Sequence, residues 1–460
     1  MKVWNSRCFT KTSLQALLLC IQLGHGGGKC TNSAWAAKVF TVLHVNEVHL
    51  VTVDYCDCEM RVPRHTQLLQ AGWYPATIHY PATCTTIKLL KHFHGLSLCS
   101  KVSAYEYYLN LERLTDNSQV DISKTRYRVF LRMVWQFHHE RMLNVALMAA
   151  GDLALTCLAC LACPQPGINL PNDWQTISLV LRNRFLYTLF VSVNANFQLK
   201  NHLRKNELLN PGLHTGLAYF VPQAPYTEHI LKHISQTNIS SCSGFAAMSQ
   251  ADSKSMQGLC YTGVGMCICT CHELVHPLEV GDLQKGKQYC NMDYIVLSTL
   301  TNLALHALMI IYDIACQWEV NFHSWMSMLP SSLHISPTVQ VTYAIPKCHL
   351  HAHQISCQSL NSLNLKPSIY WSLINPAANS TKEMGAGSHH DTLDDLFGYH
   401  NWLKTIGLGL SLHRNENDVK LWLMEMDKAE ARAGDVQMHD KSATVFLSTR
   451  LSIEESQYVI

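Results

Sequence analysis

Residues 307–318 read ALMIIYDIACQW, an apolar run that ends at Asp313 and is followed by a helix-like segment. Such a short apolar run predicts a buried strand. In α/β enzymes, a carboxylate at the carboxyl end of a buried strand commonly binds a metal ion. The same carboxylate would serve equally well as the cap of the following helix. Spacing alone leaves both interpretations of Asp313 open.

A second apolar run, LYTLFVSV at residues 186–193, also predicts a buried strand, and Asn194 follows it directly. Residues 39–44, 49–53 and 339–345 are further strand-like runs. Apolar runs of this length are typical of central strands that are covered on both faces. The expected fold class is therefore α/β, with the strands ending at residues 193 and 313 lying side by side.

Seven short segments carry a more specific pattern. They are YCDC at 55–58, CLACPQPGINLP at 160–171, GDLQKG at 281–286, NMDY at 291–294, YDIACQW at 312–318, IPKCH at 345–349 and STKEMG at 380–385. In this order they resemble motifs of the Kyakuja–Dileera–Zisupton (KDZ) transposases of fungi and of the CxC-type cysteine-cluster domain that accompanies them. The resemblance implies a cysteine-cluster domain over residues 1–165, an RNase H-like transposase core over 166–413, and a charged tail over 414–460.

The resemblance also implies a chemistry. Transposases with an RNase H-like core hold Mg²⁺ or Mn²⁺ between converging carboxylates and use the ions for phosphoryl transfer to DNA. The family places Asp at the position of Asn194, a second Asp at Asp313 and a Glu further on. Here residues 320–382 contain no Asp or Glu. We therefore expect a degenerate catalytic site of Asp313 and Asn194 and no strand transfer. The alternative is a non-catalytic DNA- or protein-binding remnant.

Cysteine is the outlier of the composition, with 19 residues and no regular spacing of a disulfide-rich small domain. Such residues in a reducing compartment are thiols or metal ligands. Cys56 with Cys58 and Cys160 with Cys163 are candidate ligand pairs, and the two pairs are expected to share one structural Zn²⁺. His25 and Cys30 lie upstream. Buried thiols that pack as small apolar side chains are the alternative.

A third candidate metal site lies after the predicted strand at 339–345. His349, His353 and Cys357 are spaced four residues apart, which places them on one face of a helix that begins near Pro346. Three such ligands suit zinc rather than magnesium. The alternative is that they pack against the strand that carries Asp313.

The net charge of +2 gives no overall attraction to nucleic acid, so DNA contact requires local basic patches. Two segments qualify, with a solvated surface as the alternative interpretation. They contain Lys124, Arg126, Arg128 and Arg132, and Lys200, His202, Arg204 and Lys205. The apolar residues 14–23 are interrupted by Gln15 and Gln22, so they predict a short helix rather than a signal peptide. We expect an intracellular, nuclear protein without membrane contact.

Overall fold

The computed structural model divides into two compact units between Asn144 and Val145, and each is described separately. The structure describes residues 2–4, 6–7, 9–25, 28–36, 39–59, 61–116, 125–146, 163–164, 170, 187–204, 212, 219–233, 258–284, 289–301, 306–363 and 371–411. Within these residues, no helix is both long enough and apolar enough to cross a bilayer.

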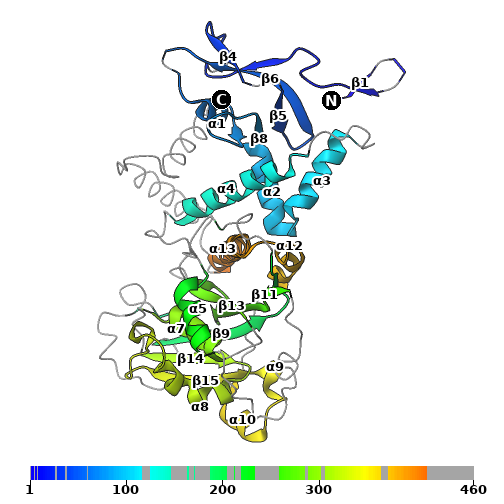
Figure 1. Ribbon diagram of the computed structural model, residues 1–460. Coiled ribbons are helices and arrows are strands. Elements are labelled where there is room, and N and C mark those ends of the chain that lie inside the picture. Colours follow the sequence, from blue (N-terminus) through cyan, green and yellow to red (C-terminus); the bar gives the residue numbers. More distant parts are fainter. Residues whose placement is uncertain are drawn as a thin grey trace. The chain divides into compact units, whose positions relative to one another are not determined.

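The first unit is built on a mixed sheet whose longest strand is β6 (Figure 1). Its strand order is β3-β6-β5-β8-β7, with β4 also paired to β6. The strands are β3 (Cys20–Gln22), β4 (Ser33–Trp35), β5 (Phe40–Leu43), β6 (Val48–Cys56), β7 (Trp73–Pro75) and β8 (Thr83–Thr86). A separate hairpin joins β1 (Lys2–Trp4) to β2 (Phe9–Lys11). In β6, buried residues alternate with more exposed ones as in a strand covered on one face.

The described part of the first unit also contains four helices: α1 (Arg64–Gln70), α2 (Ile87–Ser100), α3 (Ala104–Thr115) and α4 (Tyr127–Ala146). Ser103 and Glu106 form a capping box that fixes the start of α3. An aromatic cluster that includes Phe93, Tyr107 and Phe130 packs the last three helices together. Residues 14–18 form turns that precede β3, so the helix expected over 14–23 is wrong. The isolated apolar run was too short to specify a helix without a covering surface.

The second unit contains a six-stranded sheet with the order β13-β12-β9-β14-β15-β16. The strands are β9 (Thr188–Asn196), β12 (Gly263–Cys269), β13 (Val275–Leu283), β14 (Ala307–Tyr312), β15 (Gln340–Pro346) and β16 (Ser362–Leu363). The pairs β13–β12 and β12–β9 are antiparallel, whereas β9, β14, β15 and β16 run parallel. Tyr312 pairs with Val193, which confirms that the two predicted central strands are neighbours.

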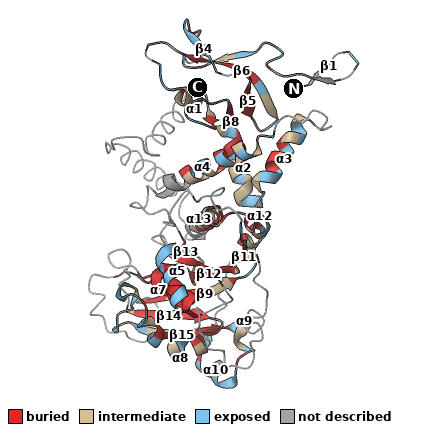
Figure 2. Cartoon of the chain, viewed as in Figure 1, coloured by how far each residue is buried: buried red, intermediate tan, exposed pale blue. Residues whose placement is uncertain are grey.

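Helices α7 (Tyr289–Thr299) and α8 (Ala315–Met326) pack against this sheet (Figure 1). Every residue of α7 is buried, so the helix is enclosed on all sides (Figure 2). Trp318 of α8 is fully buried and stacks edge-on against Tyr312 at the end of β14. Burial of these large aromatic side chains fixes the position of the turn that carries Asp313.

The remaining elements of the second unit are short, except for α5 and α13. They are β10 (Asn201–His202), α5 (Gln223–Lys232), β11 (Leu259–Tyr261), η4 (Ser331–Leu333), α9 (Lys347–Leu350), α10 (Ile355–Leu360), α11 (Trp371–Ile374), η5 (Asn375–Ala377), α12 (Ala378–Thr381) and α13 (Ala386–Ser411). Asn401 of α13 donates a hydrogen bond to the carbonyl of Val275 at 2.7 Å and accepts one from its amide at 3.0 Å. This reciprocal pair fastens α13 to β13.

Candidate functional site

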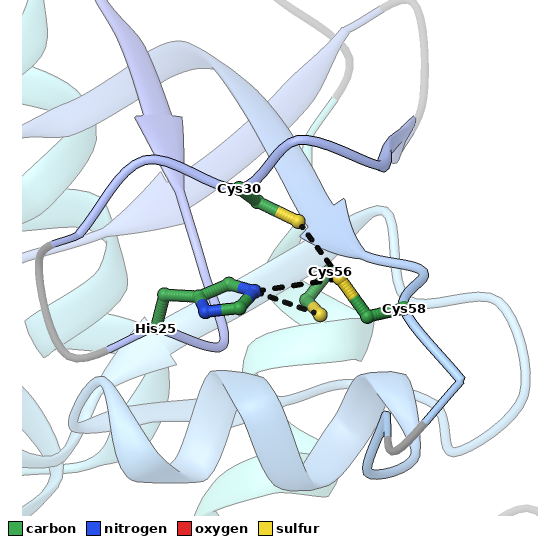
Figure 3. A group of neighbouring side chains, drawn as sticks. All are labelled: His25, Cys30, Cys56 and Cys58. Carbon is green, nitrogen blue, oxygen red and sulfur yellow. Dashed lines mark hydrogen bonds between the residues drawn. The ribbon is translucent and has the colours of Figure 1, made fainter.

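Three cysteines and one histidine of the first unit point toward a common centre (Figure 3). The ligand atoms of His25, Cys30, Cys56 and Cys58 all lie within 4.8 Å of one another. His25 Nε2 is 3.2 Å from Cys56 Sγ and 3.6 Å from Cys58 Sγ. Cys30 Sγ is 3.5 Å from Cys58 Sγ. A tetrahedral Zn²⁺ with bonds of about 2.0–2.3 Å has ligand atoms at such separations.

The sheet of the first unit brings these four residues together. Cys56 ends β6, and Cys58 follows two residues later. On one side of β6 lies β3, whose continuation carries His25 and Cys30; on the other side lies β4, where Ser33 pairs with Cys56. The loop between β3 and β4 therefore spans the end of β6. Two ligands from the strand end and two from this loop form the cluster.

Two glutamine side chains hold the backbone of the cluster. Gln67, buried in α1, accepts a hydrogen bond from the Cys56 amide at 2.8 Å and donates one to the Cys56 carbonyl at 3.0 Å. Gln22 makes the same reciprocal pair with Cys30, at 2.8 and 3.3 Å. Each glutamine fixes both polar groups of a ligand residue. Such outer contacts keep the ligands of a metal ion in place.

Gly24 makes room for this arrangement. Its φ angle of +92° lies in the left-handed region, which a residue with a side chain rarely adopts. A Cβ atom at Gly24 would also lie 2.5 Å from Cys56 Cβ. Glycine at this position thus permits the loop to pass directly over the end of β6.

The cluster has the chemistry of a closed structural zinc site. Three sulfur ligands and one imidazole fill a tetrahedron and suit Zn²⁺ better than Mg²⁺. Burial opposes ionisation of Cys30, but its contacts with the Asn32 backbone and the Cys58 thiol lower its pKa. The same thiol contact raises the pKa of Cys58 to about 11. Metal binding would release the remaining thiol protons.

The second unit places the two predicted catalytic residues next to each other. Val193 pairs with Tyr312, so Asn194, two residues before the end of β9, lies beside the carboxyl end of β14, which Asp313 follows. The strand predicted to end at residue 193 thus extends to Asn196. The Asn194 side chain is half-buried, and its Oδ1 accepts a hydrogen bond from the Ala195 amide at 2.7 Å. An amide oxygen adds no negative charge to a site for a hard cation.

Asp313 has no converging set of carboxylates among the residues that the structure describes. Among the described residues, it belongs to no group of three or more His, Cys, Asp or Glu side chains that share a potential metal position. Residues 364–370, where the family motif would place a Glu, lie outside the described residues, and their sequence NLKPSIY contains no acid.

Three more distant acids are engaged elsewhere. Asp282 Oδ2 lies 2.5 Å from His390 Nε2, and Glu383 Oε1 lies 2.8 Å from His202 Nδ1. Asp293 accepts a hydrogen bond from the Trp318 indole. Burial raises the pKa of Asp293 well above its usual value, although the indole opposes this shift. A raised pKa disfavours the charged carboxylate that Mg²⁺ binding requires.

The two predicted cysteine pairs have different partners. Cys56 and Cys58 form their cluster with His25 and Cys30, and the site predicted to be shared by the two pairs stays a prediction. Cys160 lies outside the described residues. Cys163 Sγ lies 3.4 Å from Cys269 Sγ, and His276 joins these two cysteines in a buried group. Cys269 and His276 are more than 100 residues from Cys163 in the sequence, so spacing did not predict them as its partners.

The predicted helical face over His349, His353 and Cys357 is also wrong, because the chain turns between α9 and α10. Pro346 starts α9, but that helix ends at Leu350. His353 and Cys357 do lie together, and His349 is not a member of their group. Their third neighbour is Cys316 of α8, which sequence spacing did not single out.

The basic segments are partly occupied by other contacts. Lys124 and Lys205 lie outside the described residues. Arg132 donates a hydrogen bond to the Ala76 carbonyl, and Arg128 is exposed. His202 and Arg204 both approach Glu383, and Arg204 lies at 3.9 Å from it. The segment that follows β9 is thus partly neutralised.

A second feature of the first unit is a hollow of about 430 Å³ beside the cluster of His25, Cys30, Cys56 and Cys58. Its lining includes Arg61, Arg64 and His79, together with Cys56 of the cluster. The Arg64 guanidinium lies 5.2 Å from the ring centre of Tyr55 and 5.9 Å from that of Tyr80. These aromatic contacts hold Arg64 in place.

Comparison with known protein families gives two matches. Residues 187–401 match the model of the Kyakuja-Dileera-Zisupton transposase. Residues 14–119 match the model of the CxC2 like cysteine cluster associated with KDZ transposases. Neither the curated proteins nor the solved structures contain a match to the chain. The first family region covers the sheet with Asn194 and Asp313, and the second covers the cluster of His25, Cys30, Cys56 and Cys58.

Proposed function

We propose that this chain is a KDZ transposase relative with an RNase H-like core that no longer catalyses DNA strand transfer. The two family matches, in the order of cysteine cluster and transposase, support the transposase relationship. The adjacent ends of β9 and β14 support the RNase H-like assignment, because that core holds its first two carboxylates on neighbouring strands. A protein of this ancestry would act in the nucleus.

The proposed loss of activity is supported by one observation: among the described residues, Asp313 belongs to no cluster of potential metal ligands. Asn194 holds the position on the neighbouring strand, and residues 320–382 supply no acid. A single carboxylate leaves Mg²⁺ largely hydrated and poorly positioned. Loss of one charge-stabilising group at an active site lowers kcat by roughly 100-fold or more. Two losses therefore reduce strand transfer to background.

DNA binding is the function that we propose the chain retains, and the hollow beside the cysteine cluster is its candidate contact surface. Arg61, Arg64 and His79 provide donors for phosphate oxygens. Tyr80 is 81% exposed and offers a ring on which a base can stack. Arg61 also pairs with Asp57 at 3.0 Å, which orients its guanidinium at the rim. Structural zinc would hold the Cys56 side of this hollow in place.

Catalysis is tested with a strand-cleavage and strand-joining assay on duplex DNA in the presence of Mg²⁺ or Mn²⁺. The unmodified chain and its Asp313→Ala variant should give the same background signal. Asn194→Asp should not restore activity, because the third carboxylate is still absent. Metal-dependent cleavage by the unmodified chain that Asp313→Ala abolishes would refute the proposed loss of catalysis.

DNA binding is tested separately by fluorescence anisotropy with a labelled duplex at several salt concentrations. Arg61→Gln/Arg64→Gln should weaken binding uniformly across sequences and lower the salt dependence, since each lost phosphate contact lowers the slope by about one. Arg113→Gln, on α3 of the same unit, is the matched control. Equal affinity of the double variant and the unmodified chain would exclude the hollow as the DNA contact.

A further inference from the structure

Beside Asp313, three potential ligands from separate segments meet at one point. The ligand atoms of Cys316, His353 and Cys357 lie within 4.8 Å of one another, and Cys316 Sγ is 3.4 Å from His353 Nδ1. Cys316 lies in the first turn of α8, His353 lies in the turn after α9, and Cys357 lies in α10. His353 is buried and both cysteines are partly buried.

The orientation of the His353 ring matches that of a metal ligand. Nε2 lies 2.8 Å from the carbonyl oxygen of Asp313, so Nε2 carries the proton and donates it. Nδ1 is then the acceptor nitrogen of the ring, and it lies 3.4 Å from Cys316 Sγ. A metal-binding histidine typically donates its second ring nitrogen to a backbone carbonyl or carboxylate in this way.

The turn that carries His353 is itself fixed. Gln358 donates a hydrogen bond to the His353 carbonyl at 2.7 Å, and the His353 amide donates one to the Leu350 carbonyl at 3.1 Å. His353 is thereby held before any ion binds. A preorganised ligand of this kind favours a defined coordination position over a chance approach of side chains.

We propose that Cys316, His353 and Cys357 form a binding site for a thiophilic divalent cation such as Zn²⁺. Two thiolates and one imidazole are ligands that zinc prefers and that magnesium does not. Three protein ligands leave a fourth position for water or a further side chain. The ion would join the 347–360 segment to the start of α8 and to the backbone of Asp313. This inference goes beyond the proposed DNA function and does not depend on it.

Apolar packing of two thiols is the competing explanation. Cys316 and Cys357 do pack against the core of the second unit. Such packing, with a hydrogen bond between the Cys316 thiol and Nδ1 of His353, accounts for the same positions without an ion. The two explanations differ in metal content and in thiol reactivity, so both are measurable.

The first test is zinc content per chain in full-length protein purified without chelator. Cys316→Ser/Cys357→Ser should hold one Zn²⁺ fewer than the unmodified chain, and His353→Gln should show the same loss. Cys260→Ser, a change in β11 of the same unit, should leave the zinc content unchanged. Cys56→Ser/Cys58→Ser should remove a different ion, so the losses of the two double variants should add. Unchanged zinc content in a folded Cys316→Ser/Cys357→Ser protein would overturn the proposal.

The second test uses the unmodified chain, so that misfolding of a variant does not decide the result. Zinc is first replaced by cobalt. The accessible cysteine thiols are then alkylated with iodoacetamide, with and without prior chelation, and the modified residues are mapped by mass spectrometry. Cys316 and Cys357 should be protected in the loaded protein and react after chelation, whereas the reactivity of Cys260 should not change. Equal alkylation of Cys316 and Cys357 before and after chelation would overturn the proposal.

Discussion

The two units of this chain hold their candidate functional side chains at equivalent places, the ends of strands, but with opposite results. At the end of β6, four ligand side chains meet, and Gln22 and Gln67 hold their backbone. Near the carboxyl ends of β9 and β14, the carboxylate of Asp313 follows one strand and the amide of Asn194 lies on the other. The strands are set by apolar residues in both cases. Under the proposed loss of catalysis, the second sheet keeps the strand arrangement of a metal site whose ligands have changed.

The largest effect is expected from removal of the cysteine cluster. Structural zinc contributes on the order of 10 kcal/mol in small domains, so Cys56→Ser/Cys58→Ser should unfold the first unit. Hydrogen exchange measured by mass spectrometry should show lost protection in β3, β5 and β6 and unchanged protection in β9 and β14.

Cys99→Ser, an exposed change on α2, is the control for this experiment and should keep full protection. Retained protection of β6 in the double variant would show that the cluster does not support the first unit. It would also contradict the proposed difference between the cluster at the end of β6 and the residues near the ends of β9 and β14.

The next largest effect is expected from a buried ion pair in the second unit, which we expect to stabilise the fold. Asp282 and His390 form a buried pair, and loss of one partner of such a pair costs about 3–5 kcal/mol. Asp282→Asn should therefore lower the free energy of unfolding of the second unit, measured by denaturant titration. Asp391→Asn, a more exposed position on the same helix as His390, is the control.

The same pair predicts a pH dependence. Burial alone would lower the pKa of His390, but the charge of Asp282 and their hydrogen bond raise it. A raised pKa in the folded state gives a stabilisation that is fully present below the unfolded value of about 6.5. It is lost as the pH rises through the raised pKa. The unmodified chain should show this loss, and Asp282→Asn should not; an identical pH profile for both would contradict the assigned ion pair.

A smaller effect is expected from the glutamine that holds Cys56. Gln67→Leu keeps the size of the side chain but removes three hydrogen bonds, to the amide and carbonyl of Cys56 and to the Val62 carbonyl. Loss of such an outer contact lowers metal affinity by roughly 10- to 100-fold. Competition with a chromophoric chelator measures this change, with Gln70→Leu on the exposed side of α1 as the control. Equal zinc affinity of Gln67→Leu and the unmodified chain would show that the contact does not position the ligand.

The apolar runs predicted the central strands well because burial on both faces requires an unbroken apolar sequence. Thus β14 was located to within one residue, and the run at 339–345 matches β15. The ligand groups were harder to predict. Cys316 and His353 come from segments that only the fold brings together, and the turn after α9 breaks the helical spacing. His25 and Cys30 became recognisable as ligands only once β3 and β4 were seen to flank β6.

The most direct test of the account is Mn²⁺ binding to the second unit's strand ends, measured in the full-length chain by electron paramagnetic resonance. Paramagnetic Mn²⁺ reports a bound hard cation without requiring catalysis, and its loss in Asp313→Ala assigns the site. We predict no saturable Mn²⁺ site that is sensitive to Asp313→Ala, because one carboxylate and one amide leave the ion hydrated. A saturable Mn²⁺ signal that disappears in Asp313→Ala would contradict the account and would show that a working hard-cation site remains at the ends of β9 and β14.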